Sequence, residues 1–289
     1  MTNRGKIARH PRPPQQQGRQ SGLPAPMLPM PRTEAQVYRA CRKLSGKTAL
    51  IAGGASGIGR AVAIAFAKQG ADIAIIYLSE HRDAEDTRQL ILREAVRCIL
   101  IAGDVTREDF CRNAIKRTIG AFKRLDILIS NAAEPHQRGD LQETTRKRFD
   151  RTFRTHVLGM VQLSKAALPH LPAGGTIINT ASATDFRAGA HLIDAAATTG
   201  AIVSFTQSLA QALVERRVRV NAVALDPVWM PPIPPDFAAE DGAQYAACSP
   251  LARAAEPEEI APCYVFLAAE EAAFVTGRIL HPNGGEVVA

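Results

Sequence analysis

Residues 48–70 read TALIAGGASGIGRAVAIAFAKQG. A short apolar run, 48–52, leads into a cluster of glycines. Apolar residues with helical spacing follow over 58–69, and Gly70 ends the pattern. This order predicts a strand, a glycine turn and a helix, which is the context that a dinucleotide-binding turn requires.

The glycine spacing within this turn suits a bound pyrophosphate. Gly53 can make the tight turn, Gly57 lets the backbone approach a phosphate, and Gly59 lets the helix pack closely on the strand. The free N–H groups of the helix N-terminus then favour negative charge. We expect a dinucleotide here; the alternative is a glycine-rich turn without a ligand.

The rest of the chain repeats this alternation of apolar strands and helices. Further strands are expected at 72–78, 98–102, 125–130, 175–180, 218–223 and 278–280, and further helices at 84–94, 108–122, 144–171, 195–216 and 258–268. Apolar strands that alternate with helices indicate parallel βαβ units buried on both faces. The sequence therefore predicts an α/β fold over 47–289, a single doubly wound domain with a parallel sheet.

Residues 1–46 differ in composition from this domain. Seven prolines lie within 1–31, so this part is expected to be extended, lying on the domain or on a neighbouring subunit, although a basic arm for anionic surfaces is an alternative. The net charge of the chain is +7, but 1–47 carry ten Lys and Arg against one acid. The remaining residues carry 25 basic against 27 acidic side chains, which argues against a nucleic-acid groove.

Composition excludes several other classes of protein. The chain is 46% hydrophobic and 22% charged, which fits neither a disordered nor a membrane-embedded protein, and no apolar run approaches the length of a membrane span. Five cysteines with no paired or metal-type spacing argue against a disulfide framework and a metal site. We expect a cytoplasmic protein with no membrane partner.

The motifs together resemble the short-chain dehydrogenases/reductases. They are the glycine turn, Asp104-Val105 after the third strand, Asn131-Ala132-Ala133 after the fourth, Asn179-Thr180 leading to Ser182, and Arg219-Val220-Asn221. The arm, the segment 77–81 and the segment 281–285 are similar to the branch of bacterial general-stress and glucose-dehydrogenase-like oxidoreductases. The resemblance implies a Rossmann-type fold, a homotetramer and an NAD(H) or NADP(H) cofactor.

The resemblance also implies which residues hold the cofactor. They are Gly53, Ser56, Gly57, Ile58, Gly59, Glu80, Asp104, Val105, Asn131, Ala132 and Pro227. An acid at the end of the second strand bonds the ribose 2′-OH, whereas an arginine accommodates a 2′-phosphate. The segment 77–82 contains both Glu80 and Arg82, and Arg60 could also reach a phosphate. The choice between NAD and NADP is therefore open at this stage.

The catalytic positions of the family are occupied differently here. The family uses a Tyr as proton donor and a Lys four residues later that lowers the Tyr pKa and holds the ribose. The flanking Leu192-Ile193-Asp194 and Gly200-Ala201 set the register, so that Ala195 stands for the Tyr and Thr199 for the Lys. Ser182 is retained, no lysine follows Lys165, and loss of the ribose lysine implies weakened cofactor binding.

Other positions in this region also bear on function, and His156 and Asp226 admit two interpretations each. His156 stands at the family's helical Asn and could act as an acid or base, or simply fill the position. Asp194 fits a structural role, and Asp226 either pairs with a cationic substrate or forms a turn. Met230 replaces the Thr that contacts the carboxamide, and Ala52 replaces the usual Thr before the glycine loop.

Three functions remain open from the sequence. The first is a catalytically silent homologue that keeps the fold and the dinucleotide. The second is an oxidoreductase or isomerase with a non-standard acid or base such as His156, together with Ser182 or Asp226. The third is a scaffold whose basic arm carries the function. The substrate or ligand is a small molecule that the sequence does not identify.

Overall fold

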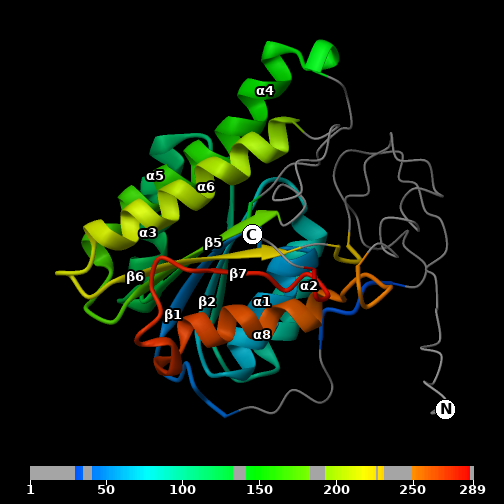
Figure 1. Cartoon of the computed structure of the whole chain (residues 1–289). Helices are drawn as coiled ribbons and strands as arrows, with labels where there is room; N and C mark the ends of the chain where they lie inside the picture. Colours follow the sequence, from blue (N-terminus) through cyan, green and yellow to red (C-terminus); the bar gives the residue numbers. More distant parts are fainter. Residues whose placement is uncertain are drawn as a thin grey trace, which may run out of the picture.

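Figure 1 shows the fold of the chain in a computed structural model. The structure describes residues 30–34, 41–132, 141–182, 193–225, 227–230 and 249–286. These residues form one α/β unit in which a central sheet lies between two layers of helices (Figure 1).

A seven-stranded parallel sheet forms the centre of the described part of the chain. Its spatial order is β3-β2-β1-β4-β5-β6-β7. The strands are β1 (Thr48–Ala52), β2 (Asp72–Tyr77), β3 (Cys98–Ala102), β4 (Ile127–Ser130), β5 (Thr176–Ser182), β6 (Arg219–Leu225) and β7 (Ile279–Leu280). The strand order reverses between β1 and β4, and ligands of such sheets bind outside the carboxyl ends of the strands at that point.

Helices cover both faces of this sheet (Figure 1). On one face lie α1 (Gly57–Lys68), α2 (His81–Leu92) and α8 (Pro257–Ala268), with α1 packed along α8. On the other lie α3 (Glu108–Phe122), α5 (Gly159–Ala167) and α6 (Ile193–Ala212), and α4 (Arg146–Phe153) extends beyond them. Short turns of helix are η1 (Leu141–Glu143), η3 (Leu168–His170) and η5 (Glu270–Ala272).

Alternate residues of the strands fill two separate apolar cores. Ile51, Ile73 and Ile75 belong to the core under α1 and α8. Leu50 and Ile76 belong to the core under α3 and α5. All five residues of β1 are buried, as expected for a central parallel strand covered on both faces. The doubly wound α/β fold expected from the sequence is therefore confirmed.

The long helix expected at 144–171 is interrupted. It begins with α4, widens into a π-helical turn η2 (Arg154–Leu158), resumes as α5 and tightens into η3. Pro169 is the second residue of η3, and because proline has no N–H it cannot extend a regular α-helix. The expectation of one uniform helix was wrong, and the π turn falls on the segment that carries His156.

The described part of the N-terminal segment contacts the body. Residues 30–34 form neither helix nor strand, and Pro31 is buried. Leu44 is fully buried in the core beside α1, and its N–H donates to the Gln69 carbonyl. Residues 1–29, for which we expect an extended chain, lie outside the described residues.

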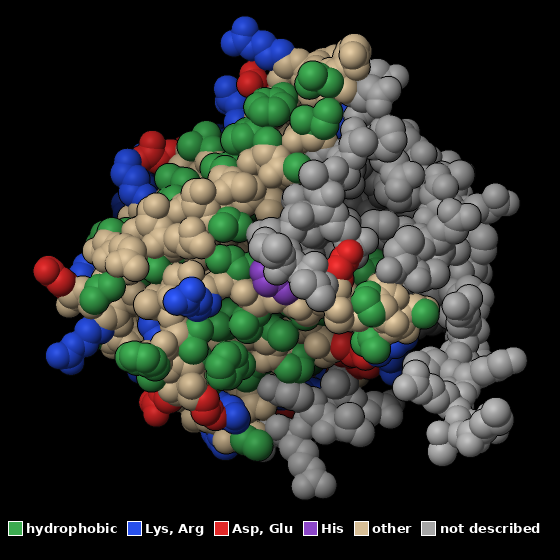
Figure 2. Space-filling model, viewed as in Figure 1, with side chains coloured by type: hydrophobic (Ala, Val, Ile, Leu, Met, Phe, Trp, Pro, Cys, Tyr) green, Lys and Arg blue, Asp and Glu red, His purple; other side chains and the backbone are tan. Residues whose placement is uncertain are grey.

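One surface of the molecule is rich in apolar side chains. Figure 2 shows many of them over the region of α8, with most charged side chains toward the edges and a basic one among the apolar side chains. Phe266 of α8 is 40% exposed and Phe274 is fully exposed. Among the described helices, none has the length and apolar character that a bilayer span requires.

Candidate functional site: a glycine turn at the carboxyl edge of the sheet

The glycine turn between β1 and α1 has the geometry that the sequence predicts. Gly53 has φ +76°, and the N–H groups of Gly53 and Gly54 donate to the Ile76 carbonyl at the end of β2. A Cβ on Gly59 would lie 2.0 Å from the Gly53 carbonyl oxygen, so only glycine fits there. Ser56 is the N-cap of α1 and makes no capping bond with its side chain. The first N–H groups of α1 therefore face the carboxyl edge of the sheet without helical partners.

A chain of side-chain hydrogen bonds joins this turn to the neighbouring strands. The Asn131 amide nitrogen donates to the Gly53 carbonyl at 3.3 Å, and Asn131 Oδ1 accepts from the Thr180 hydroxyl at 3.2 Å. The Thr180 hydroxyl also lies 2.7 Å from the Tyr264 hydroxyl of α8. Tyr264 is fully buried, and burial raises its pKa. Asn131 was expected from the sequence, whereas the contribution of Tyr264 was not.

The third-strand motif lies in a compact turn. Asp104 Oδ1 accepts from the Thr106 N–H at 2.8 Å, which orders the turn before α3. Val105 is buried, and a Cβ on Gly159 would lie 2.9 Å from its side chain, so α5 approaches this turn closely. Gly103 before it has φ +154° and lies against the Phe110 ring. Asp104 itself stays half-exposed, and a ligand can reach it.

The end of β2 carries the side chains that bear on the choice of cofactor. Glu80 accepts hydrogen bonds from the Ser79 N–H and hydroxyl, at 3.1 and 3.2 Å. Arg60 turns toward α2, where it donates to the Asp83 carbonyl, the Thr87 hydroxyl and the Ala55 carbonyl. Its guanidinium group is therefore already engaged. Burial raises the pKa of the Asp83 carboxyl, and the nearby Arg60 offsets part of that effect.

The positions that the sequence assigns to the catalytic pair lie on the first turns of α6. Ala195 is 1% exposed and Thr199 is 5% exposed. Thr199 Oγ1 accepts a hydrogen bond from the Ser182 N–H at the end of β5, at 3.4 Å. The hydroxyl of the neighbouring Thr198 donates to the Ala195 carbonyl at 2.8 Å. Ser182 and Thr199 therefore lie side by side.

Asp194 is part of a buried ion pair. Arg148 of α4 donates to both carboxylate oxygens, and the Thr152 hydroxyl lies 3.4 Å from one of them. Asp194 is 1% exposed, so its charge is balanced within the fold. The structural interpretation of Asp194 agrees with these contacts, whereas its partner Arg148, 46 residues earlier, was not expected from the sequence.

His156 lies in the π turn η2, which packs against α6. It is partly exposed. π turns inside α-helices are rare and occur frequently at functional sites. The fold therefore brings the segment of His156 to the helix that carries Ala195 and Thr199.

Residues 227–230, which we call the wall, border the glycine turn. Pro227 is buried, its carbonyl accepts from the Ala255 N–H, and Val228 pairs with Ala255 in a parallel bridge. A Cβ built on Gly57 would lie 3.2 Å from Met230 Sδ. Met230 and Gly57 thus face each other. Asp226 lies outside the described residues.

The predicted residues come together at one edge of the sheet. Gly53, Asn131, Ser182 and Pro227 follow or end the four adjacent strands β1, β4, β5 and β6. The glycines of the turn are closely packed against neighbouring atoms, as the tight strand-to-helix turn of a dinucleotide site requires, so the turn fits such a cofactor. The described residues contain no cluster of three or more potential metal ligands.

A glycine turn at the switch point of a parallel sheet defines a dinucleotide-binding α/β protein of the Rossmann type. A family model described as "Enoyl-(Acyl carrier protein) reductase" matches residues 53–286. The chain belongs to the short-chain dehydrogenase/reductase family, whose cofactor is NAD(H) or NADP(H).

Known proteins support this assignment along nearly the whole chain. General stress protein 39 of Bacillus subtilis is 46% identical over 96% of this chain and 96% of its own length. Glucose and ribitol dehydrogenase homolog 2 of Arabidopsis thaliana is 42% identical over 96% of this chain and 98% of its own. A short-chain dehydrogenase from Burkholderia cenocepacia, solved in complex with NADP, superposes with TM-score 0.79 at 32% identity, over 84% of this chain and 98% of that one. The resemblance expected from the sequence is confirmed.

Proposed function

We propose that this protein binds a nicotinamide dinucleotide across the carboxyl edge of its sheet, and binds it weakly. Gly53, Gly57 and Gly59 would hold the pyrophosphate with the help of Ser56 and Ile58. Asp104 and Val105 would hold the adenine; Asn131, Ala132 and Pro227 would line the cofactor. The observation that supports this best is the 2.0 Å approach of a Gly59 Cβ to the Gly53 carbonyl, since the turn admits no other residue.

The same site favours NADH over NADPH. Glu80 lies at the end of β2, 21 residues beyond Gly59, where an acid typically bonds a ribose 2′-OH. Its carboxylate is held against Ser79, and Arg60 is engaged with Asp83 and Thr87. A 2′-phosphate would therefore meet the Glu80 carboxylate while Arg60 is engaged elsewhere, which leaves the exposed Arg82 as the nearby arginine that could balance its charge.

The proposal includes the loss of the family's ordinary alcohol and ketone chemistry. When bound, the cofactor supplies a hydride, and the protein must supply or remove a proton at the substrate oxygen. Ala195 has no transferable proton, and Thr199 carries no charge that could lower a phenol pKa. The bond from Ser182 N–H to Thr199 Oγ1 supports this interpretation, because the hydroxyl serves to tie α6 to β5.

Other described side chains make poor substitutes for the missing pair. Tyr264 is fully buried, its pKa is raised, and its hydroxyl is bonded to Thr180. Lys165, the last lysine of the chain, lies on the surface beside Glu108. Ser182 remains to orient a substrate oxygen, but orientation alone does not transfer a proton.

Calorimetric titration with NADH and NADPH tests the binding half of this proposal. We expect saturable binding of NADH and weaker binding of NADPH. The matched control is Gly57→Val, because Gly57 has φ +53° and faces Met230, and a branched side chain there would fill the phosphate space. Absence of binding by the wild-type protein, or wild-type affinity in Gly57→Val, would contradict dinucleotide binding at this site.

The chemical half is tested by restoring the pair as Ala195→Tyr with Thr199→Lys. Because His156, Asp226 and Met230 also depart from the family pattern, we expect the double variant to gain only partial activity over the wild-type protein. Equal and high activity of the two proteins would show that the pair is not what limits turnover.

A second candidate function is oxidoreduction or isomerisation with His156 as the acid or base. The π turn at Arg154–Leu158 and its packing against α6 favour it, since π turns occur frequently at functional sites and an imidazole can act as an acid or a base. If this function holds, His156→Ala abolishes turnover and His156→Gln does not rescue it. Turnover that survives His156→Ala excludes it.

Further parts of the proposal concern assembly, location and domain limits. We propose a homotetramer that buries the apolar face around Phe266 and Phe274; sedimentation equilibrium tests it, and a monomer contradicts it. We propose a reducing cytoplasmic location, in keeping with the free thiols of Cys41, Cys98, Cys111 and Cys263 among the described residues. We keep the division into an arm, 1–46, and a dinucleotide domain, 47–289.

A further inference from the structure

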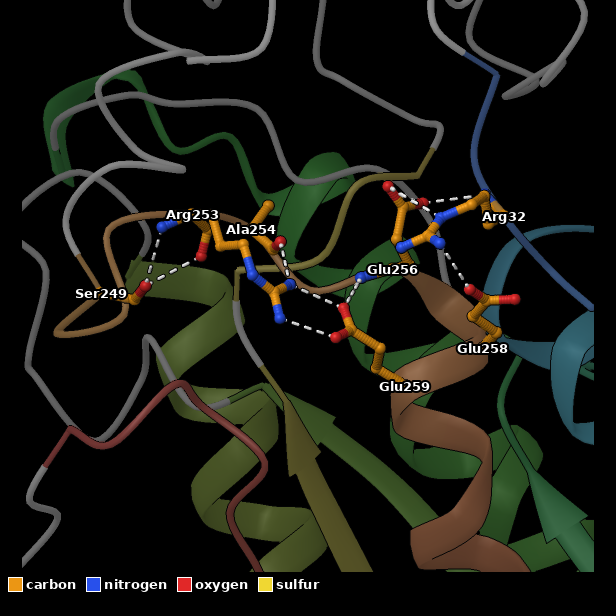
Figure 3. A network of polar contacts seen from close by, with 7 residues as sticks. All are labelled: Arg32, Ser249, Arg253, Ala254, Glu256, Glu258 and Glu259. Atoms are coloured by element: carbon orange, nitrogen blue, oxygen red, sulfur yellow. Dashed lines mark hydrogen bonds and ion pairs between the residues drawn. The ribbon is translucent and has the colours of Figure 1, made fainter. Parts of the chain in front are cut away.

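The N-terminal arm meets the body at the start of α8, as Figure 3 shows. The Arg32 N–H donates to Glu256 Oε2 at 2.8 Å, and the Glu258 N–H donates back to the Arg32 carbonyl at 3.1 Å. The Arg32 guanidinium adds ion pairs with Glu258 at 3.2 Å and Glu256 at 3.8 Å. One residue of the arm therefore makes backbone and side-chain contacts with the same helix end.

The backbone contacts matter most, because Glu256 is buried. It is 1% exposed, whereas the Arg32 side chain is 62% exposed. Ion pairs of an exposed side chain contribute little, but a buried carboxylate depends on its hydrogen-bond donors. Glu256 is also the N-cap of α8 and shares a capping box with Glu259. The Arg32 N–H thus helps to fix the residue at which α8 begins.

The residue before Glu256 is bonded to the wall of the dinucleotide site. The Ala255 N–H donates to the Pro227 carbonyl at 2.9 Å, and the Trp229 N–H donates to the Ala255 carbonyl at 2.8 Å. Val228 pairs with Ala255 between them. The position of Ala255 therefore directly determines the position of residues 227–230.

This wall faces the glycine turn. Trp229 is 5% exposed, and the next residue, Met230, lies across from Gly57, where a Cβ would be 3.2 Å from its sulfur. Met230 of the wall therefore lies against Gly57, where a dinucleotide phosphate would approach the turn. Any shift of the wall changes the room that a dinucleotide phosphate finds above the turn.

We propose that Arg32 is a positioning residue for the dinucleotide site. It holds Glu256 and Ala255, and through them residues 227–230, at a fixed distance from the glycine turn. The arm thereby preorganises one side of the site, so that the wall need not be ordered when the dinucleotide binds. The consequence for affinity rests on the dinucleotide binding proposed above; the consequence for the wall does not.

A neighbouring contact of the arm provides a matched control. Glu34 pairs with Lys68 of α1 at 3.0 Å, on the other side of the groove lined by Thr33, Ala61 and Pro262. This pair ties the arm to α1 rather than to the N-cap of α8, although Lys68 also acts electrostatically on Glu258. Glu34→Gln should therefore leave the wall unchanged. Asp72→Asn is a second control, because it breaks the Arg97 pair at the opposite edge of the sheet and lowers stability far from the site.

The first test uses Trp229, the single tryptophan of the chain, as a reporter of the wall without any ligand. Arg32→Pro removes both the N–H donor and the guanidinium, and Arg32→Ala removes only the guanidinium. We expect acrylamide to quench Trp229 more strongly in Arg32→Pro than in Arg32→Ala, with Glu34→Gln and Asp72→Asn equal to wild type. Wild-type quenching in a folded Arg32→Pro protein overturns the proposal, as does quenching in Asp72→Asn that is as strong as in Arg32→Pro.

The second test is calorimetric affinity for NADH in the same variants. We expect about 5-fold weaker binding in Arg32→Pro, the lower end of typical coupling between sites, and a smaller loss in Arg32→Ala. A variant that loses thermal stability but keeps full affinity makes Arg32 merely structural and overturns the proposal. Absence of NADH binding by the wild-type protein refutes the proposed function instead, while the Trp229 test still decides the role of Arg32.

Discussion

The Arg148 guanidinium of α4 holds the Asp194 carboxylate of α6 through two hydrogen bonds, from Nε at 3.0 Å and from Nη2 at 3.2 Å. Asp194 Oδ1 also accepts from the Ala195 N–H at 3.1 Å. The pair therefore fixes the first turn of α6 and the place of Ala195 within it. The Arg148–Asp194 pair would therefore also set the backbone position of any other side chain introduced at 195.

Breaking this pair should destabilise the fold strongly. In Asp194→Asn the Arg148 guanidinium, which is only 18% exposed, loses its counter-charge. Removing one partner of a buried ion pair typically costs about 3–5 kcal/mol. Denaturant unfolding measures the loss. The control is Arg112→Gln, which breaks an exposed pair with Glu108 and should cost less than about 0.5 kcal/mol. Equal losses in both variants would contradict the structural role of Asp194.

Gly59→Ala should distort the turn more than the small size of the added methyl group suggests. The added methyl group would lie 2.0 Å from the Gly53 carbonyl oxygen, so the strand-to-helix turn must shift. We expect lower thermal stability together with loss of dinucleotide binding. Gly120→Ala in α3 is the control, since a Cβ there meets nothing within 4 Å. It should instead stabilise the protein by about 1 kcal/mol, the difference in helix propensity. A neutral Gly59→Ala contradicts the close approach.

Local sequence patterns predict some features of this structure and miss others. The glycine turn and the seven strands follow from periodicity and from glycines whose effect is local, whereas Asn131 and Asp104 were expected from the resemblance to the family. The π turn at His156 does not follow from such patterns, because no residue type in Arg154–Leu158 marks the place where the helix changes to i→i+5 hydrogen bonds. Nor do the contacts of Tyr264 with Thr180 and of Arg32 with Glu256, which join residues 84 and 224 positions apart.

Thr199→Lys should tighten dinucleotide binding. A lysine at this position would add a charged hydrogen bond to the ribose, worth roughly 1.5–3 kcal/mol, or about 10–150-fold in affinity. Calorimetry with NADH measures the gain. Thr199→Met has a long side chain without the charge and should show no gain. If both variants bind NADH as the wild-type protein does, position 199 does not face the ribose.

The Arg253–Glu259 pair at the start of α8 should make stability depend on pH. Arg253 donates two hydrogen bonds of 2.7 Å to Glu259, and these bonds hold the pKa of the carboxyl below its usual 4.5. A lowered folded-state pKa adds stability that is present above the unfolded pKa and is lost as the pH falls through the folded value. In Arg253→Gln we expect lower stability than wild type at pH 7 and a shrinking difference below about pH 4.5. A constant difference from pH 7 to 3 would contradict this account.

Steady-state turnover of the wild-type protein tests the central claim most directly. The assay offers a panel of alcohols, sugars, aldehydes and ketones with each nicotinamide dinucleotide, at concentrations at which calorimetry shows the cofactor bound. The missing acid–base pair predicts rates about 10²–10⁴-fold below those of a relative with the complete pair under the same conditions. Rates comparable to that relative would contradict the account, and His156→Ala would then decide whether the imidazole has taken over the proton transfer.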